Sequence, residues 1–290
     1  MQRLAIVIFL AISSPAPAQW LASPTPGIPR TSDGSPNLSA PAPRTAWDTA
    51  DFSGVWAATR VSGDLPASVR MKPWVQELMD QRQQNFYANS PRYNCLPSGP
   101  AYLTSGSTSG GVRRIVQSPT FIAILHEDMT HRQIFMDGRE LEADPFPTWM
   151  GYSIGFWDGD TLVVESNGYN DKTWVDRRGA SHTEQLRITE RYRRVDFGHI
   201  ELEVTYDDPG SFDSPLHATI ELVNQADTEM LEVVCNEYPQ TGSGWSGDIA
   251  QFQSTTVEVD AAILARYVGT YEGLWLGRTL SLIHISEPTR

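Results

Sequence analysis

The stretch EQLRITERYRRVDFGHIELEVTY, residues 184–206, decides the fold. Its apolar residues recur at every second position on both sides of a short break at residues 196–198. A period of two is typical of a β-strand with one buried face, and a short break containing Gly is typical of a tight turn. The stretch therefore predicts an antiparallel β-hairpin.

The turn also sets the register of this hairpin. A three-residue loop with Gly198 in the left-handed conformation places Arg193 opposite Glu201. The buried face then carries Leu186, Ile188, Tyr192, Ile200, Leu202, Val204 and Tyr206. Glu190 lies on the same face, where a carboxylate needs an arginine or hydroxyl partner or a proton of its own.

Strand-like segments with the same period continue on both sides of the hairpin. They are predicted at 115–117, 121–127, 132–136, 152–157, 161–167, 184–194, 199–206, 218–223 and 230–235. Asp-Gly pairs at 137–138 and 158–159 supply further tight turns. Regular short strands joined by tight turns are typical of an all-β antiparallel meander, so we expect a lipocalin-like barrel or, as the alternative, a sandwich.

The β domain as a whole is predicted over residues 51–253, with one helix inside it and an arm before it. Residues 19–50 are rich in Pro, Ser and Ala and are predicted to be a disordered arm, because they offer little apolar surface to bury. The tripeptide Pro-Arg-Thr at 29–31 recurs in this arm at 43–45. An amphipathic helix is predicted at 73–89. Its expected buried face is Trp74, Leu78, Met79, Arg82 and Phe86.

Both ends of the chain carry patterns of a different kind. Residues 1–18 combine a basic start, an apolar run and the ending Ala-Pro-Ala, which is typical of a cleaved secretory signal peptide. We therefore expect a periplasmic or secreted protein. Residues 254–279 begin a helix followed by a strand. Residues 280–290, LSLIHISEPTR, resemble the translation of a sequencing-library adapter, so the natural sequence is expected to continue differently after Thr279.

The composition restricts the partners. A formal net charge of -13 and a pI near 4.8 would repel a phosphate backbone, so nucleic acid is not expected as a partner. No stretch after residue 18 is long and apolar enough to span a bilayer, so no integral membrane segment is predicted. The sequence does not indicate an oligomeric state.

The chain has two cysteines, Cys95 and Cys235. In an oxidising compartment, an isolated pair favours one intramolecular disulfide, and two buried free thiols are the alternative. The spacing matches neither a zinc knuckle nor a redox Cys-x-x-Cys pair. No metal site and no bound cofactor are expected.

Several short motifs cluster between residues 51 and 237. They are DFSGVW (51–56), CLPSGP (95–100), PTWMGYSIG (147–155), WDGDTLVV (157–164), GYND (168–171), HTE (182–184) and ERYRR (190–194). Together they resemble a widespread family of exported bacterial β proteins. The resemblance implies export, a cysteine pair and a β core, but no particular reaction. The Gly-Val-Trp at 54–56 is also similar to the Gly-x-Trp of the first strand in lipocalin-type barrels.

The densest polar cluster precedes the hairpin. Asn170 and Asp171 lie in a loop with Trp174, and His182 and Glu184 follow, two positions apart. Because alternate residues of a strand face one side, His182 and Glu184 are predicted to point together toward the barrel mouth. A histidine oriented by a carboxylate can act as a base, so His182, Glu184 and Asp171 are the candidate catalytic residues. The alternative is a hydrogen-bonded loop that holds Trp174 against the barrel end.

Three functions follow from these patterns. The leading hypothesis is a barrel that binds a small, partly apolar molecule near its mouth. The second is a cofactor-independent enzyme that uses His182 with a carboxylate partner, and the third is a structural or interaction module. The candidate ligand-binding residues are Trp149, Trp157, Asn170, Trp174, Glu190 and Tyr192.

Overall fold

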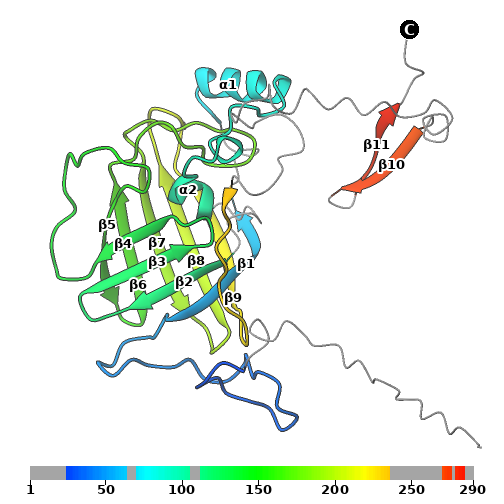
Figure 1. Ribbon diagram of the computed structural model, residues 1–290. Coiled ribbons are helices and arrows are strands. Elements are labelled where there is room, and N and C mark those ends of the chain that lie inside the picture. Colours follow the sequence, from blue (N-terminus) through cyan, green and yellow to red (C-terminus); the bar gives the residue numbers. More distant parts are fainter. Residues whose placement is uncertain (1–23, 64–69, 105–111, 236–269, 276–277, 285–290) are drawn as a thin grey trace, which may run out of the picture. The chain divides into compact units, whose positions relative to one another are not determined.

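The computed structural model describes residues 24–63, 70–104, 112–235, 270–275 and 278–284. Within these residues, nine strands form one closed barrel (Figure 1). The strands are β1 (Gly54–Gly63), β2 (Val112–Gln117), β3 (Phe121–His126), β4 (His131–Phe135), β5 (Tyr152–Asp158), β6 (Thr161–Asn167), β7 (Arg187–Arg194), β8 (His199–Asp207) and β9 (Leu216–Asn224). The predicted all-β barrel is confirmed, and the sandwich alternative is wrong.

The strand pairing departs from the predicted meander at one place. Neighbouring strands of the barrel pair antiparallel, and β1 closes the barrel on β9, but β4 and β5 pair in parallel. Residues 136–151 carry the chain back to the end of the barrel at which β4 began. A connection of this length allows two consecutive strands to run in the same direction, which a tight hairpin does not.

The register of the β7–β8 hairpin is as predicted. Arg193 pairs with Glu201, and their side chains form an ion pair of 2.7 Å. The conformation expected of Gly198 is wrong, because this residue is not among the glycines with positive φ. Gly198 is instead required for space, since a Cβ there would lie 2.4 Å from the Cβ of Leu38. The Asp196 carboxylate tightens the turn by accepting the Gly198 amide at 2.9 Å.

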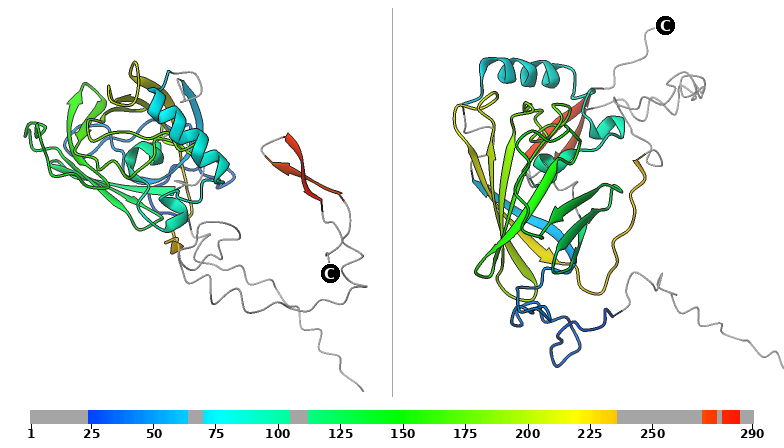
Figure 2. Two further views of the ribbon diagram at one scale, coloured as in Figure 1. Left: turned by 90° about the horizontal axis from the view of Figure 1, so that it is seen from above. Right: turned by 90° about the vertical axis from the view of Figure 1, so that its left-hand side faces the viewer.

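The two ends of the barrel carry different segments (Figures 1 and 2). One end, here called the helical end, carries α1 (Pro73–Gln84), η2 (Arg92–Asn94) and α2 (Gly99–Thr104). The opposite end, here called the arm end, carries residues 24–52, which contact the turn between β7 and β8. This division determines where a site can lie.

Residues 24–50 form two similar turns at the arm end. In the first, the Asn37 amide donates to the Pro29 carbonyl at 2.8 Å, and in the second, the Asp51 amide donates to the Pro43 carbonyl at 3.1 Å. The repeated Pro-Arg-Thr tripeptide therefore marks a structural repeat. This order differs from the predicted disordered arm, because backbone hydrogen bonds within the turns and to the barrel replace the apolar burial that the segment lacks.

The arm end of the barrel interior is filled by aromatic rings. Phe52 stacks on Trp157 with ring centroids 6.0 Å apart, and the Trp56 indole donates to the Phe52 carbonyl at 3.0 Å. The guanidinium of Arg194 lies 4.9 Å from the Trp56 ring centroid and donates to backbone carbonyls around it. Burial lowers the pKa of Arg194 to about 10. These groups fill the interior at the arm end.

Helix α1 is shorter than the predicted helix at 73–89. It ends at Gln84 with Asn85 as its C-cap, and Phe86 and Tyr87 then have positive φ angles of 49° and 58°. Phe86 and Trp74, which were expected on the buried face, are exposed, and Val75 is buried in their place. The other three residues of the predicted face, Leu78, Met79 and Arg82, are partly buried, so only the two aromatic positions of the prediction are wrong.

The predicted disulfide between Cys95 and Cys235 is confirmed. The predicted strand at 230–235 is wrong, because this segment runs beside the barrel as an extended chain and does not pair with a strand. It is held by a hydrogen bond of 2.6 Å from the Val233 amide to the Glu127 carbonyl and by the disulfide that follows. The disulfide therefore fixes this segment at the helical end.

A second compact unit spans Trp245–Arg290. Among its described residues, β10 (Thr270–Trp275) and β11 (Arg278–His284) form an antiparallel hairpin, and the segment resembling an adapter overlaps β11. The predicted signal peptide at 1–18 and the predicted helix after Asp260 lie outside the described residues. No described helix is long and apolar enough to cross a membrane.

Candidate functional site

The predicted catalytic pair is separated in the structure. His182 is 1% exposed, whereas Glu184 faces solvent. The expectation that the two share a face is wrong because β7 begins only at Arg187 and residues 183–186 form a turn, in which the Leu186 amide donates to the Thr183 carbonyl at 3.2 Å. The alternation of strand side chains therefore does not extend back to His182.

Both ring nitrogens of His182 are hydrogen-bonded. Nδ1 lies 2.9 Å from the Thr183 carbonyl, which can only accept, so Nδ1 carries the proton. Nε2, 2.5 Å from the Thr173 hydroxyl, is then the acceptor. Burial lowers the pKa of His182, although the Thr183 carbonyl and the nearby Asp208 and Asp171 act in the opposite direction, and the ring stays neutral. This arrangement orients a loop and leaves no nitrogen for a substrate.

The loop residues before His182 do not form a ligand clamp. Asp171 is exposed, and the side-chain oxygen of Asn170 accepts the Lys172 amide at 3.2 Å. Trp174 is buried under the guanidinium of Arg82, which lies 4.5 Å from its ring centroid. The geometry matches the alternative of a hydrogen-bonded loop that holds Trp174 against the barrel end.

The predicted aromatic pocket is likewise not assembled. Trp157 stacks on Phe52 at the arm end, whereas Trp174 lies under Arg82 of α1 at the helical end. Trp149 is half-buried on the outer surface, in a groove of about 620 Å³ between β4 and β5 where Phe135 and Tyr152 also lie. The three tryptophans therefore do not share a pocket.

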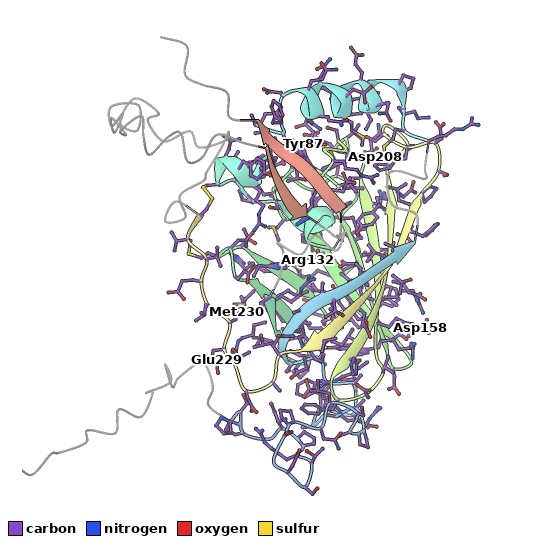
Figure 3. All side chains as sticks on the ribbon, turned by 90° about the vertical axis from the view of Figure 1, so that its right-hand side faces the viewer. Tyr87, Arg132, Asp158, Asp208, Glu229 and Met230 are labelled. Carbon is purple, nitrogen blue, oxygen red and sulfur yellow. A yellow bond between two sulfur atoms is a disulfide. The ribbon has the colours of Figure 1, made fainter. Side chains whose placement is uncertain are left out.

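Glu190 and Tyr192 do meet, inside the barrel. The Tyr192 hydroxyl donates to Glu190 Oε1 at 2.8 Å, and Arg132 Nη2 lies 2.6 Å from Glu190 Oε2. Glu190 is 0% exposed, so this carboxylate is fully removed from water. Figure 3 shows Arg132 within the barrel, where it also bonds Ser153 and Ser166 at 3.1 and 2.9 Å.

Two further basic side chains lie in the same part of the interior. Arg113 on β2 is directly opposite His126 on β3, and Arg132 follows on β4. All three are buried, at 2%, 6% and 3% exposure respectively. They are here called the basic row. Each is at the end of its strand nearest the helical end, since the turn at 127–130 joins β3 to β4 there.

The sequence contained the signal for the basic row. In each of the three strands, the basic residue is two positions from a buried isoleucine and therefore faces the same side of the sheet. The pairs are Arg113 with Ile115, His126 with Ile124, and Arg132 with Ile134. The alternation that placed Glu190 among core residues would have placed these three as well.

The interior sets the protonation states of this cluster. Burial, assisted by the cations of Arg113 and Arg132, holds the pKa of His126 well below its ordinary value. Burial alone would lower the pKa of Arg132, but the adjacent Glu190 carboxylate makes the net shift a rise. Burial raises the pKa of Tyr169 to about 12. At neutral pH the cluster therefore holds charged arginines, a neutral imidazole and protonated phenols.

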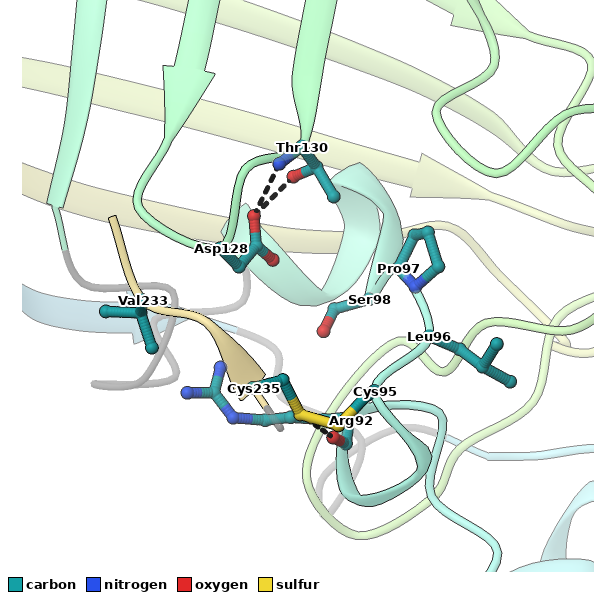
Figure 4. A pocket seen from close by; sticks show the side chains of 9 residues that line it. All are labelled: Arg92, Cys95, Leu96, Pro97, Ser98, Asp128, Thr130, Val233 and Cys235. Carbon is teal, nitrogen blue, oxygen red and sulfur yellow. Dashed lines mark hydrogen bonds between the residues drawn. A yellow bond between two sulfur atoms is a disulfide. The ribbon is translucent and has the colours of Figure 1, made fainter. Parts of the chain in front are cut away.

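A pocket of about 440 Å³ lies at the helical end beside the disulfide (Figure 4). Its lining consists of Arg92, Cys95, Leu96, Pro97, Ser98, Asp128, Thr130, Val233 and Cys235. Asp128 Oδ1 accepts the Thr130 amide and hydroxyl at 3.0 and 2.6 Å, which shapes one wall. The same turn connects to the basic row, because the His126 amide donates to the Thr130 carbonyl at 2.9 Å.

Among the described residues, no group of three or more His, Cys, Asp or Glu side chains is placed to hold a metal ion. The helical end thus offers charged and polar side chains together with an apolar pocket wall.

Comparisons with known proteins give little further information. No family model matches the chain, and no curated protein matches it. A solved structure of a variant of the fluorescent protein UnaG is similar over 60% of this chain and 96% of that chain, at 14% sequence identity and a TM-score of 0.30. The barrel assignment rests on the strand pairing of the chain itself.

Proposed function

We propose that this chain is an exported β-barrel that binds a small, partly apolar molecule at its helical end. One observation carries the proposal: charged side chains are buried inside the barrel only a turn away from a pocket at the same end. Burying charge costs stability unless it is compensated, so clusters of this kind concentrate at functional sites.

The pocket has the size and chemistry of a small-molecule site. Its volume of about 440 Å³ falls within the roughly 300–1,000 Å³ common for such sites. Leu96, Pro97 and Val233 supply apolar walls, while Ser98 and Thr130 supply polar groups that could orient a ligand. The disulfide fixes two of these walls to each other.

The other two functions have less support. An enzyme based on His182 needs a free ring nitrogen, and the hydrogen bonds of His182 occupy both nitrogens. A purely structural or interaction module needs neither a pocket nor buried charged side chains beside it.

The binding proposal can be tested with a matched pair of variants on the extended segment. Purified protein is incubated with a bacterial metabolite and lipid mixture, desalted, and the retained compounds are identified by mass spectrometry. Val233→Trp fills the pocket and should abolish retention. Leu231→Trp, two residues away on a side chain that is already exposed, should retain the same compounds. Equal retention by both variants, or no retention by the unmodified protein, would contradict the proposal.

Export is the second part of the proposal, and the disulfide supports it because such bonds persist in oxidising compartments. Expression of the full chain in a bacterial host, followed by intact-mass measurement of the periplasmic protein, should give a mass that lacks residues 1–18. A periplasmic protein that retains Met1, or protein found only in the cytoplasm, would argue against it.

A further inference from the structure

We propose that the basic row of Arg113, His126 and Arg132 binds the carboxylate of the ligand. This inference rests on the proposed function and adds the chemical class of the molecule: a monocarboxylate with an apolar body. The apolar body would lie in the pocket beside the disulfide, and the carboxylate would lie at the row.

The row presents its donors in one place. Arg113 and His126 are direct partners across the β2–β3 ladder, and Arg132 lies on the next strand with its side chain on the same inner face. Three consecutive strands thus aim basic side chains at one region of the interior. Guanidinium groups match the planar geometry of a carboxylate and are the preferred side chains for binding one away from water.

His126 gives an independent indication of a ligand. Its Nδ1 is buried and has no hydrogen-bond partner among the described residues. A buried polar atom that loses its hydration without a replacement is costly, so native structures rarely leave one unsatisfied without a reason. A ligand oxygen at this nitrogen would supply the missing partner.

Glu190 shows that the interior already accepts a carboxylate by this chemistry. Its oxygens are bound by Arg132 and by the Tyr192 hydroxyl. Burial raises the pKa of Tyr169 and of Tyr192, so both phenols near the row are neutral at pH 7. The charged groups that act on His126 are Arg113 and Arg132, and Glu190 lies beside them as the ion-pair partner of Arg132.

The pocket and the row are neighbours along the chain. Thr130 lines the pocket, and its carbonyl accepts the amide of His126. A ligand held against Thr130 therefore lies beside the strand end that carries the imidazole.

The test compares acids with their methyl esters, which have the same shape but no charge. Binding of dodecanoate, naphthoate and both methyl esters is measured by isothermal titration calorimetry. The unmodified protein should bind at least one acid about tenfold or more tightly than its ester, as expected for loss of one charge-assisted interaction. Arg113→Met and His126→Leu should remove this preference, while Arg114→Met, which changes the outward-facing neighbour on β2, should keep it.

Two conservative variants guard against misfolding. Arg113→Lys keeps the charge and His126→Gln keeps a side-chain donor, so both should restore part of the preference for the acid, with circular dichroism confirming a folded barrel. Equal affinity for acid and ester in the unmodified protein would overturn the inference while leaving the binding proposal intact. A neutral compound retained from the metabolite mixture, with no binding of either acid, would do the same. No binding in either experiment would overturn both.

Discussion

The two ends of the barrel interior follow the same alternation of strand side chains but are filled with different chemistry. At the arm end, Phe52, Trp56 and Trp157 pack together, and the buried Arg194 is bonded to backbone carbonyls on several sides. At the helical end, the interior positions hold the basic row and Glu190, and the His126 Nδ1 atom has no partner in the described part of the chain. The arm end is filled with packed rings, and in our proposal the charge buried at the helical end binds a ligand.

The largest effect is expected at the arm end. Trp56→Ala removes a fully buried ring that contacts Phe52 and supports the Arg194 guanidinium. The free energy of unfolding should fall by about 3–5 kcal/mol, as for other large aromatic deletions in cores. Urea unfolding measures the loss. A change below about 1 kcal/mol would mean that the arm end is not the stabilising half.

A single substitution in the buried ion pair should lower the free energy of unfolding slightly less than Trp56→Ala does. A second substitution in the pair should restore part of the loss. Arg132→Met leaves the Glu190 carboxylate buried without its cation, so a loss of about 3 kcal/mol is expected. Adding Glu190→Gln removes the charge and keeps an acceptor for Tyr192. The double variant should recover more than half of the loss in urea unfolding. An equally unstable double variant would show that the two side chains are not coupled.

The contact of the arm with the barrel predicts a smaller effect. Gly198→Ala places a Cβ against the backbone and side chain of Leu38, so the arm must shift. A loss of about 1–2 kcal/mol is expected, in the range for overpacking. Hydrogen exchange at the Gly198 amide, which donates to the Leu38 carbonyl, should become faster. Gly159→Ala is the control, because its Cβ would meet nothing within 4 Å while its φ of 60° is positive. Its loss of stability measures backbone strain alone, whereas that of Gly198→Ala measures crowding.

The smallest expected effect is a pH dependence of the free energy of unfolding, caused by buried histidines at the helical end. Burial lowers the pKa of His126 and of His182, so at mildly acidic pH the unfolded chain binds more protons than the folded one. The free energy of unfolding should therefore fall as the pH drops through about 6.5, the ordinary value for histidine. His126→Gln should make this slope shallower. Urea unfolding at several pH values that gives the same slope for the variant would contradict a neutral, buried His126.

Much of the fold could be predicted from the sequence, because strand period and turn residues are local signals. The β7–β8 register followed from the turn length and from the match of Arg193 with Glu201. The order of residues 24–50 could not be predicted, because it depends on hydrogen bonds between segments that are distant in the sequence. The parallel pairing of β4 and β5 depends on the path of residues 136–151, which carries no periodic signal.

The candidate site was only partly predictable for a related reason. The alternation of strand side chains predicts correctly that Glu190 is buried. It gives the wrong result for His182 and Glu184, because the alternation ends where the strand ends. The same alternation, applied to β2, β3 and β4, would have located the basic row. Which of these buried side chains converge depends on closure of the barrel, and that is a property of the whole chain.

Chemical-shift perturbation on isotope-labelled protein, titrated with naphthoate, tests the difference between the two ends most directly. The account predicts that the perturbed amides cluster at the helical end, around His126, Thr130 and Arg132, and that those of Trp157 and Phe197 at the arm end stay unchanged. Perturbations centred on the arm end, or spread evenly over both ends, would contradict it.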